Sequence, residues 1–372
     1  MRTEELRVTP EFRLLRAGRF LIAELLVPHR VLSTSCGETE SLTHIINHQS
    51  CEGAGHRERE AYITGIGLDG YHDAVCREIG LDARITASMG TAANMNYAAI
   101  CEQQDGSLRV TAVVTAGVHG NAACAGDTAG WRETESGWDK IPPPGGTINT
   151  MLFLSHPLTR GAMARAAVTM TEAKSAALTR LAVRSRYSKD AATGTGTDQY
   201  AIAAPMEGGK PLTSTGPHVK LGEMIGLAVR DATSEALRWQ NGLEPSYTRS
   251  LFHALGPYGL NESTFFEDIA PFLSPAALEL LRKNSKSVFY EPLAAAAAYA
   301  IASVLDRVRY GTLPSSTASE ALRQQAALLA ANLAARPDRW PDFLLRLVDA
   351  DPEQPARLVL QAIALGWSLK WN

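Results

Sequence analysis

The sequence lacks several features that would assign it to a specialised class of protein. No stretch reaches the roughly 18 consecutive apolar residues that a membrane-spanning helix needs. The first twenty residues mix both charge signs and lack the apolar core of a signal peptide, so we expect a cytoplasmic protein. Thirty-six basic and 39 acidic residues leave a net charge of −3, which argues against a nucleic-acid partner.

The five cysteines are too few and too scattered for a disulfide framework, since they form no C-x-x-C pair and their number is odd. His44, His48, Cys51 and His56 invite a metal interpretation, because residues four apart share one face of a helix. Their spacing matches no well-defined zinc pattern and lacks the glutamate of H-E-x-x-H. We therefore expect a short polar helix over 38–48 and no metal or other cofactor.

Glycine, histidine and cysteine are concentrated in one part of the chain. Before residue 246 lie 26 of the 30 glycines, 8 of the 9 histidines and all five cysteines. Beyond that point the pattern is helical throughout, and Thr317 with Glu320 predicts a capping box at the start of one helix. We expect a catalytic domain over 1–245, followed by an all-α region over 246–372.

Hydrophobic periodicity in the first 245 residues predicts a mixture of strands and helices. Runs rich in β-branched residues predict strands at 19–27 and 31–35, joined as a hairpin, and at 108–115, 147–154 and 199–204. Helical patterns cover 71–79, 158–181 and 221–240. Between 130 and 146 the composition turns to Trp, Pro and Gly, which indicates a surface excursion. The expected fold is an α+β catalytic domain, built as an α/β sandwich.

Three clusters in this domain combine small residues with hydroxyl, amide or charged side chains. The first directly follows a strand and holds Thr115, Gly117, His119 and Asn121. Its glycines let backbone amides approach a ligand, and its His or Asn could donate a hydrogen bond to a developing oxyanion. A tight turn with a surface histidine explains the same residues equally well.

The second cluster is the loop Thr-Gly-Thr-Gly-Thr-Asp at 193–198, which leads into a strand. It lacks the GK[ST] ending of a P-loop, and it precedes a strand rather than the helix that follows a dinucleotide fingerprint. The hydroxyls of Thr195 and Thr197 and the carboxylate of Asp198 suit a polar substrate group or a water. A bulged strand start is the structural alternative.

The third cluster contains Glu172 and Lys174 on the predicted helix 158–181. The two charges lie two residues apart and point in different directions, so they do not form a surface i, i+4 pair. If alanines bury this helix, one charge must face a polar cavity or a partner, and exposure of both is the alternative. Elsewhere, the step Gly90-Thr91 presents a hydroxyl that could act as a nucleophile.

Taken together, five motifs in one order resemble the adenosylcobinamide amidohydrolase family. They are VTAGVHGNAACAGD (114–127), GTIN (146–149), TMTEAKSAAL (169–178), ATGTGTDQ (192–199) and TGPHVKLGEMIG (215–226). The stretch STSCGETESLTHIINHQ (33–49) is similar to the opening of that family, so the resemblance covers about 19–240. It implies a corrinoid substrate and hydrolysis of the amide that joins the aminopropanol arm to the corrin ring. The products would be adenosylcobyric acid and 1-aminopropan-2-ol, in corrinoid salvage.

A second resemblance is to the self-processing β-peptidyl aminopeptidases. It rests on the segments MGTA (89–92), LRVTAVVT (108–115), GTINTMLFLSHPL (146–158) and GTGTDQYAIAAP (194–205). This resemblance implies an αββα sandwich whose Gly-Ser/Thr step supplies the nucleophile, which would be Thr91 in this chain. An uncleaved Thr91 lacks the free α-amine that serves as the base in such enzymes.

Amide hydrolysis needs an attacking oxygen, a base, donors for the oxyanion and an acid for the leaving amine. We expect Thr91 or a water as nucleophile, and His218 as base because an imidazole titrates near neutral pH. Asn149 and the backbone amides of 117–121 would bind the oxyanion. The polarising and acidic groups would be Glu172, Lys174 and Asp198. The remaining contacts to substrate would come from Thr115, Gly117, His119, Asn121, Thr195 and Thr197.

Two rival functions stay open. One is a corrinoid-binding protein without hydrolytic activity, although the chain has no D-x-H-x-x-G corrinoid signature. The other is an amidohydrolase or aminopeptidase that acts on a different substrate. The helical region after residue 245 could cover the active site, form a homo-oligomer interface or dock a partner, and its residues do not choose among these.

Overall fold

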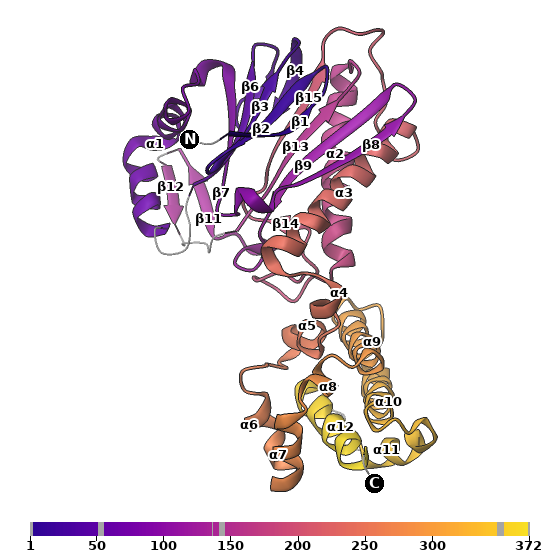
Figure 1. Ribbon diagram of the computed structural model, residues 1–372. Coiled ribbons are helices and arrows are strands. Elements are labelled where there is room, and N and C mark those ends of the chain that lie inside the picture. The colour runs from indigo at the N-terminus through magenta and orange to yellow at the C-terminus, as the bar shows by residue number, and fades with distance from the viewer. Residues whose placement is uncertain (1–2, 51–55, 136, 141–145, 348–352, 371–372) are drawn as a thin grey trace. The chain divides into compact units, whose positions relative to one another are not determined.

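The computed structural model describes residues 3–50, 56–135, 137–140, 146–347 and 353–370 (Figure 1). The chain divides into two compact units, Met1–Leu243 and Glu244–Asn372. The first unit combines two large β-sheets with three long helices, and the second is helical. The α+β fold followed by an all-α region, expected from the sequence, is therefore confirmed.

One sheet of the first unit has five strands in the order β1-β2-β3-β6-β7. Their bounds are β1 Thr3–Val8, β2 Phe12–Ala17, β3 Phe20–Leu25, β6 His44–Gln49 and β7 Thr86–Thr91. Neighbouring strands are antiparallel except β6 and β7, which run parallel. The connection between these two strands is helix α1 (His56–Glu78), as parallel pairing requires a crossover.

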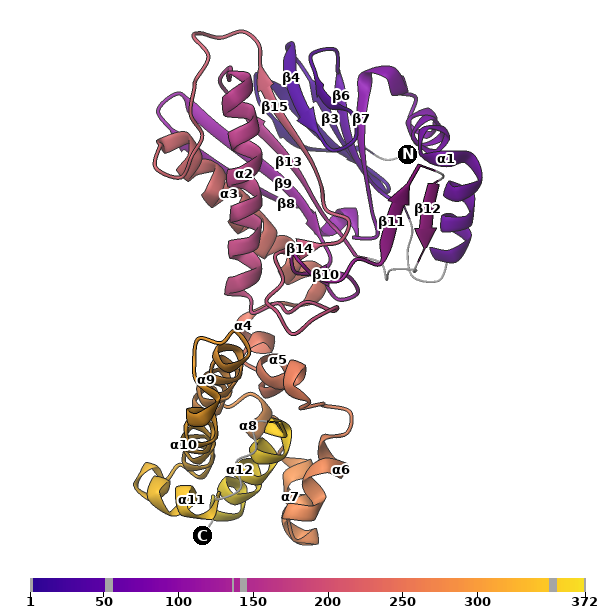
Figure 2. The ribbon, with the colours of Figure 1, turned by 180° about the vertical axis from the view of Figure 1, so that it is seen from behind.

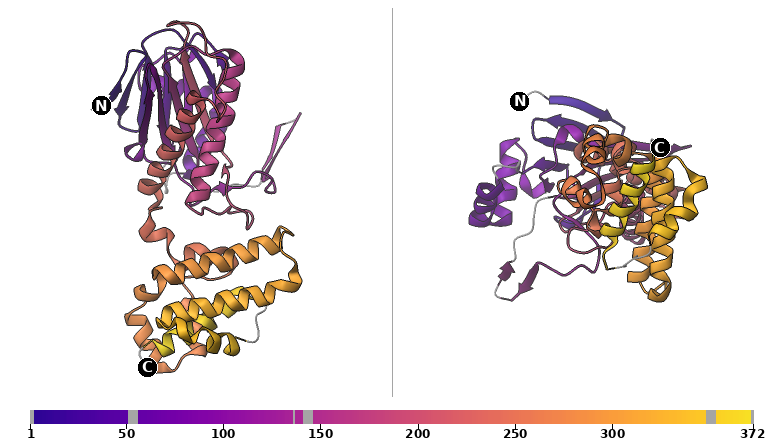
Figure 3. Two further views of the ribbon diagram at one scale, coloured as in Figure 1. Left: turned by 90° about the vertical axis from the view of Figure 1, so that its right-hand side faces the viewer. Right: turned by 90° about the horizontal axis from the view of Figure 1, so that it is seen from below.

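The other sheet has six strands in the order β5-β4-β15-β13-β9-β8. Their bounds are β4 His29–Ser33, β5 Gly37–Thr39, β8 Ala99–Asp105, β9 Leu108–Ala116, β13 Ile148–Leu154 and β15 Gln199–Pro205. Only β13 and β15 are parallel, and helix α2 (Arg160–Arg180) lies between them in the chain. Helix α3 (Lys220–Asn241) follows β15 and packs beside α2 (Figures 2 and 3).

Alternate residues of each strand enter different cores, and this alternation defines the layers. Phe20 of β3 packs under α1 against Tyr71, while the next residue, Leu21, faces the opposite sheet. In the six-stranded sheet, Met151 faces the five-stranded sheet and Leu152 packs against α2 and α3. The unit is thus an αββα sandwich, the layering that the second resemblance implies.

The predicted helix over 38–48 is wrong, because this segment forms β5 and β6. Strand β6 lies inside its sheet and is buried on both faces, by α1 on one side and the other sheet on the other. A strand buried on both faces shows no polar alternation, so its pattern is hard to separate from that of a short helix. His44 and His48 therefore belong to a strand and not to a helix end.

The predicted hairpin between 19–27 and 31–35 is also wrong, although both strands exist. Strand β3 pairs with β2 and β6, whereas β4 pairs with β15 and β5 in the other sheet. The peptide at Pro28 carries the chain from one sheet to the other, and its carbonyl accepts a hydrogen bond from the Met206 amide. In contrast, the predicted strands at 108–115, 147–154 and 199–204 and the three predicted helices are confirmed.

The surface excursion predicted for 130–146 includes a two-stranded ribbon of β11 (Trp131–Thr134) and β12 (Gly137–Lys140). The residues Pro142, Pro143 and Pro144 lie outside the described residues. A further two-stranded pair, β10 (Ala122–Ala123) with β14 (Gly194–Thr195), brings the first and second sequence clusters together.

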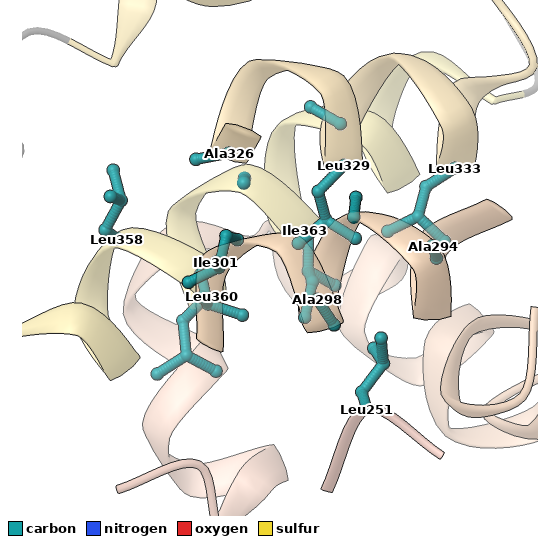
Figure 4. Packing of buried hydrophobic residues seen from close by; sticks show 14 of the residues in the cluster. Leu251, Ala294, Ala298, Ile301, Ala326, Leu329, Leu333, Leu358, Leu360 and Ile363 are labelled. Atoms are coloured by element: carbon teal, nitrogen blue, oxygen red, sulfur yellow. The ribbon is translucent and has the colours of Figure 1, made fainter. Parts of the chain in front are cut away.

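The second unit has its own hydrophobic core, in which aliphatic side chains of three long helices interlock (Figure 4). The helices of this unit are α4 Pro245–Thr248, α5 Leu251–Leu255, α6 Phe265–Ile269, α7 Pro275–Lys283, α8 Lys286–Phe289, α9 Pro292–Arg309, α10 Ser315–Ala334, α11 Trp340–Arg346 and α12 Pro355–Leu369. The predicted capping box is wrong: the N-cap of α10 is Pro314, three residues before Thr317, and the Thr317 hydroxyl donates to the Pro314 carbonyl. Across the described part of the chain, none of the helices is both long and apolar enough to cross a bilayer.

Candidate functional site

The ends of four strands from the two sheets meet at one end of the sandwich. Thr91 is the last residue of β7, and Thr115 is the second-last residue of β9. Asn149 and Gln199 lie at the starts of β13 and β15. The small pair of β10 and β14 lies at the same end (Figure 2). Three of the five family-like motifs therefore converge here, although they are far apart in the sequence.

A cavity of about 980 Å³ opens beside β10 and β14. The described residues that line it are Asn121, Ala123–Ala125, Asp127–Gly130, Thr171, Lys174, Ser175, Tyr187 and Thr193–Asp198. This volume lies at the upper end of the usual range for small-molecule sites. The walls are mostly small residues and hydroxyls, so the cavity suits a bulky ligand that also carries polar groups.

Lys174 and Asp198 form an ion pair at the wall of this cavity. Their side chains are 14% and 16% exposed, so solvent screens the pair less than it screens a surface pair. The Asp198 carboxylate also accepts hydrogen bonds from the amides of Ile148 (2.9 Å) and Thr195 (3.0 Å) and from the Thr195 hydroxyl (2.5 Å). Four donors thus fix this carboxylate in one orientation.

Gly194 gives the ion pair the space that it occupies. A Cβ atom at this position would lie 2.4 Å from Asp198 Oδ2 and 2.8 Å from Lys174 Nζ. Gly196, two residues further along, has only ordinary contacts at the equivalent point, the nearest being Asn121 Oδ1 at 3.4 Å. The alternating glycines of this loop are therefore not equivalent.

Asn121 and Thr197 line the cavity, but their polar groups are largely used within the protein. Asn121 Nδ2 donates to the Gly146 carbonyl (2.8 Å), and Asn121 Oδ1 accepts from the Tyr187 hydroxyl (2.6 Å). The Thr197 hydroxyl donates to the same Gly146 carbonyl (2.8 Å). These two residues hold the loops around the cavity in place. The role of Tyr187 is not indicated by any pattern in the sequence.

Asp127 lies at the rim and holds a second loop. Its Oδ2 accepts from the Cys124 amide (2.7 Å) and the Ser185 hydroxyl (2.6 Å). Burial would raise the pKa of this carboxyl, but hydrogen bonds from Ser185, Ser188 and the Cys124 amide outweigh it and keep the pKa below its ordinary value. The carboxylate form therefore fastens this loop at neutral pH.

Thr91, Thr115 and Asn149 meet in a different place, a buried polar cluster between the two sheets. Asn149 Nδ2 donates to Asn47 Oδ1 (2.9 Å) and to the Gly90 carbonyl (3.1 Å), and Asn47 Nδ2 donates to the Thr115 hydroxyl (2.7 Å). None of these residues is among those that line the cavity. Since both Nδ2 hydrogens of Asn149 are engaged, the structure does not support its expected role as an oxyanion donor.

Thr91 itself is only 3% exposed, and its hydroxyl accepts a hydrogen bond from the Ala93 amide (3.0 Å). The preceding Gly90 amide donates to Gln199 Oε1 (2.9 Å). Strand β7 is therefore bonded to Gln199, the residue next to Asp198. Thr91 is buried and is not among the described residues that line the cavity, so the geometry gives no support to its expected role as the attacking hydroxyl.

The structure does not bring His218 to the other expected residues. His218 is exposed and directly precedes α3, whereas Gln240 at the other end of α3 accepts a hydrogen bond from the Asn94 amide (2.9 Å). At 1.5 Å per residue, roughly 30 Å of helix lies between His218 and Gln240. Because Asn94 follows Thr91 by three residues, the structure does not support His218 as a base for Thr91.

Other expected contacts also lie away from the cavity. The Gly117 amide donates to the Thr147 carbonyl (3.0 Å), and the Val118 amide donates to Asn241 Oδ1 (3.0 Å), so neither is available to an oxyanion. His119 is mostly exposed, and its pKa is lowered by partial burial and by the nearby Arg186 charge. Glu172 is exposed and lines a separate groove of about 310 Å³ between α2 and α3.

Candidate metal ligands are dispersed in the described part of the chain. Within the described ranges, no three His, Cys, Asp or Glu side chains gather as a metal site would require. Cys51 lies outside the described residues. His48 is buried and its Nε2 lies 3.1 Å from the Tyr71 hydroxyl, so it belongs to the core beneath α1.

Together, these features define a class: an αββα protein with a half-buried Lys–Asp pair and a threonine at the wall of a large cavity. The chain belongs to the adenosylcobinamide amidohydrolase family, whose model matches residues 5–245. The family is one of hydrolases that act on amides, and the matched region includes every residue that lines the cavity.

Two further similarities were found. An uncharacterised protein of Methanocaldococcus jannaschii is 37% identical over 183 residues, which cover 47% of this chain and 71% of the relative. The crystal structure of the PH0078 protein from Pyrococcus horikoshii OT3 is 12% identical, with a TM-score of 0.29, and covers 63% of this chain and 83% of that protein.

Proposed function

We propose that this chain hydrolyses the amide between the aminopropanol arm and the corrin ring of adenosylcobinamide. Adenosylcobyric acid and 1-aminopropan-2-ol would be the products, in corrinoid salvage. The observation that carries the proposal is the Lys174–Asp198 pair at the wall of the large cavity, within the part of the chain that matches the family.

The Lys174 ammonium supplies the positive charge that the reaction needs. When an amide carbon is attacked, negative charge develops on its oxygen, and a fixed donor near that oxygen lowers the barrier. An ammonium group has three N–H donors, and one of them is directed at Asp198. Among the described residues the other two have no partner, so they can donate to the substrate oxygen, in a site with little solvent to weaken the attraction.

The walls of the cavity fit the bulk of a corrinoid. Ala123, Ala125 and Ala129 contribute small side chains to the lining, so the ring system meets little obstruction. The hydroxyls and the rim carboxylate of Asp127 add polar contacts of the kind that a corrin periphery, with its amide side chains, accepts.

The test is incubation of the purified chain with adenosylcobinamide and chromatographic separation of the products. We expect cleavage by the wild-type protein and a loss of at least about 100-fold in kcat/KM for Lys174→Met, the size of effect seen when an oxyanion donor is removed. Arg180→Met is the matched control, because Arg180 lies on the same helix, is exposed and does not line the cavity. Its kcat/KM should stay within about twofold of the wild-type value.

The rival functions give different results in the same experiment. A corrinoid-binding protein would retain adenosylcobinamide without releasing 1-aminopropan-2-ol. An amidohydrolase or aminopeptidase for another substrate would neither bind nor cleave it, and the loss of activity in Lys174→Met would then appear only with that other amide.

A further inference from the structure

Thr195, Asp198 and Lys174 form a continuous line of hydrogen bonds on the cavity wall. The Thr195 hydroxyl donates to Asp198 Oδ1 at 2.5 Å, and Asp198 Oδ2 accepts from the Lys174 ammonium. A hydroxyl bonded to a base that a third group orients is the arrangement found in enzymes with an activated nucleophile. Here the Asp198 carboxylate has the place of such a base, and the Lys174 ammonium has the place of the orienting group.

The hydroxyl of Thr195 differs from the other hydroxyls of the cavity in the group to which it donates its hydrogen bond. The hydroxyls of Thr171, Ser175 and Thr197 donate to backbone carbonyls, of Ala167, Thr193 and Gly146 respectively. A carbonyl oxygen cannot take up a proton at neutral pH, whereas a carboxylate can. Among the lining hydroxyls whose hydrogen bonds are described, Thr195 is the one that donates to a carboxylate.

The backbone also fixes Thr195. Its amide donates to Asp198 Oδ2 at 3.0 Å, and its strand β14 pairs with β10, where Thr195 lies opposite Ala122. Thr195 and Asp198 are therefore held by the same short loop, and groups held in this way need little reorganisation to react.

We propose that Thr195 is the nucleophile of this site and that the reaction passes through an ester between Thr195 Oγ1 and the corrinoid acyl group. This inference rests on the proposed function, since it assigns a step of the same reaction. Thr195 Oγ1 attacks the amide carbon as its proton passes to Asp198, and the oxyanion forms beside Lys174. The carbon–nitrogen bond then breaks, the proton moves from Asp198 to the leaving nitrogen, and 1-aminopropan-2-ol departs.

A water completes the reaction by the same route. Asp198 takes a proton from the water as its oxygen attacks the ester carbon, and Thr195 Oγ1 leaves with that proton. The net change is the addition of one water across the amide, so no oxidant, reductant or further reactant is needed.

The first experiment compares Thr195→Val with Thr195→Ser. We expect kcat to fall at least about 1,000-fold in Thr195→Val, since the nucleophile is removed, while Thr195→Ser restores it to within about tenfold of wild type. Thr171→Val removes another cavity hydroxyl and should cost less than tenfold. If Thr195→Val keeps more than half of the wild-type kcat, water attacks directly and the inference is overturned, although the proposed function stands.

The ester can also be observed directly, because a corrinoid is coloured. Acid quenching during the first turnovers should leave visible absorbance on the denatured wild-type chain, and peptide mapping should place it on Thr195. The ester would be ruled out if the wild-type chain, quenched while it turns over substrate, carries no bound chromophore and the Thr195→Val variant is active.

A probe that does not depend on the substrate separates this inference from the proposed function. A β-lactone acylates an activated hydroxyl whichever amide the enzyme prefers. Labelling at Thr195 in the wild type, and its loss in Asp198→Asn, would support the inference even if adenosylcobinamide is not cleaved. Failure to label Thr195 would contradict it, while absence of cleavage alone would contradict only the proposed function.

Discussion

Gly194 controls whether Lys174 and Asp198 can meet, because a methyl group there would lie within 3 Å of both charged groups. We predict that Gly194→Ala lowers kcat/KM on adenosylcobinamide at least about 100-fold, since a shift of 1 Å in a catalytic group has that order of effect. Steady-state kinetics of the purified variant would measure this loss.

Gly196→Ala is the matched control within the same loop. Neither glycine has a positive φ, so alanine fits the backbone at both positions, and only the neighbours of the added methyl differ. We expect Gly196→Ala to stay within about threefold of wild type. Equal losses in the two variants would mean that the loop, and not the ion pair, is sensitive to added bulk.

His29 makes the stability of the first unit depend on pH. It is fully buried, its Nδ1 lies 2.7 Å from the Val27 carbonyl, and its Nε2 has no partner among the described residues. Burial lowers the pKa of this imidazole, although the Val27 carbonyl and Glu11 oppose the shift. Because the folded-state pKa lies below the ordinary value of about 6.5, the unfolded chain binds the extra proton first as the pH falls.

We therefore predict that the free energy of unfolding falls as the pH drops from 7 through about 6.5 and on toward the lowered pKa of His29. Urea unfolding at pH 7 and pH 5 would measure the difference. The decrease should be smaller in His29→Gln than in the wild type. A decrease of the same size in both proteins would exclude His29 as its cause.

The sequence identified the residues of the cavity better than it identified their roles. Lys174, Thr195 and Asp198 were predicted as site residues, since charges and hydroxyls among small residues are rarely needed for packing alone, and all three line the cavity. His218 is predicted as the base because imidazole titrates near neutral pH, and this property does not say where the side chain lies. The distance between two residues depends on the order of the strands in the sheets, and local patterns in the sequence do not predict that order.

At the scale of the elements, helix α3 contains a second pair of glycines in contrasting surroundings. A Cβ atom at Gly222 would lie 1.9 Å from the Gly216 carbonyl oxygen, whereas nothing lies within 4 Å of the equivalent point at Gly226. The loop before α3 therefore lies directly against the helix at Gly222.

We predict that Gly222→Ala lowers the free energy of unfolding by at least about 2 kcal/mol, because the loop must move away from the helix. Gly226→Ala should raise it by about 0.5–1 kcal/mol, since alanine favours a helix over the unfolded chain. Chemical denaturation of the two variants against wild type would test the contrast. A similar decrease in both would show that the crossing is not tightly packed.

The elements that the sequence predicts correctly have a long run of β-branched or aliphatic residues, or a clear end. Strands β9 and β13 carry long β-branched or aliphatic runs, and α3 ends at Gly242, which adopts the left-handed conformation with φ of 62°. Strand β6 is buried on both faces as β13 is, but it has only two adjacent Ile residues among polar ones, so its segment lacks such a run and resembles a polar helix. No local pattern in the sequence could predict that β4 pairs with β15, because β15 lies far along the chain. Thr34 and Tyr200, which meet where these strands pair, are 166 residues apart.

At the scale of the whole molecule, all the residues that line the cavity lie in the first unit, and each unit has a hydrophobic core of its own residues. We predict that a chain of residues 1–243 folds and cleaves adenosylcobinamide with kcat within about threefold of the full chain. Circular dichroism and the chromatographic assay would check both points. An insoluble or inactive fragment would show that residues 244–372 take part in folding or in the reaction.

The layering of the first unit could be predicted only in part. Strands and helices in mixed order indicated an α+β fold, but the αββα arrangement came from the resemblance to known families and not from periodicity. The two sheets are distinguished by which strands pair, and the crossing at Pro28 between them depends on contacts with residues near position 206.

The late arrival of β15 has a consequence for synthesis of the chain. Strand β4 is made early, but its long partner is added only after some 166 further residues, which takes the ribosome about 10–30 s at ordinary rates. During that interval the apolar side chains of β4, such as Val31, have no completed sheet to cover them. Nascent chains that stop before residue 205 therefore expose an incomplete sheet and are prone to aggregate, whereas release of the full chain allows the sandwich to close.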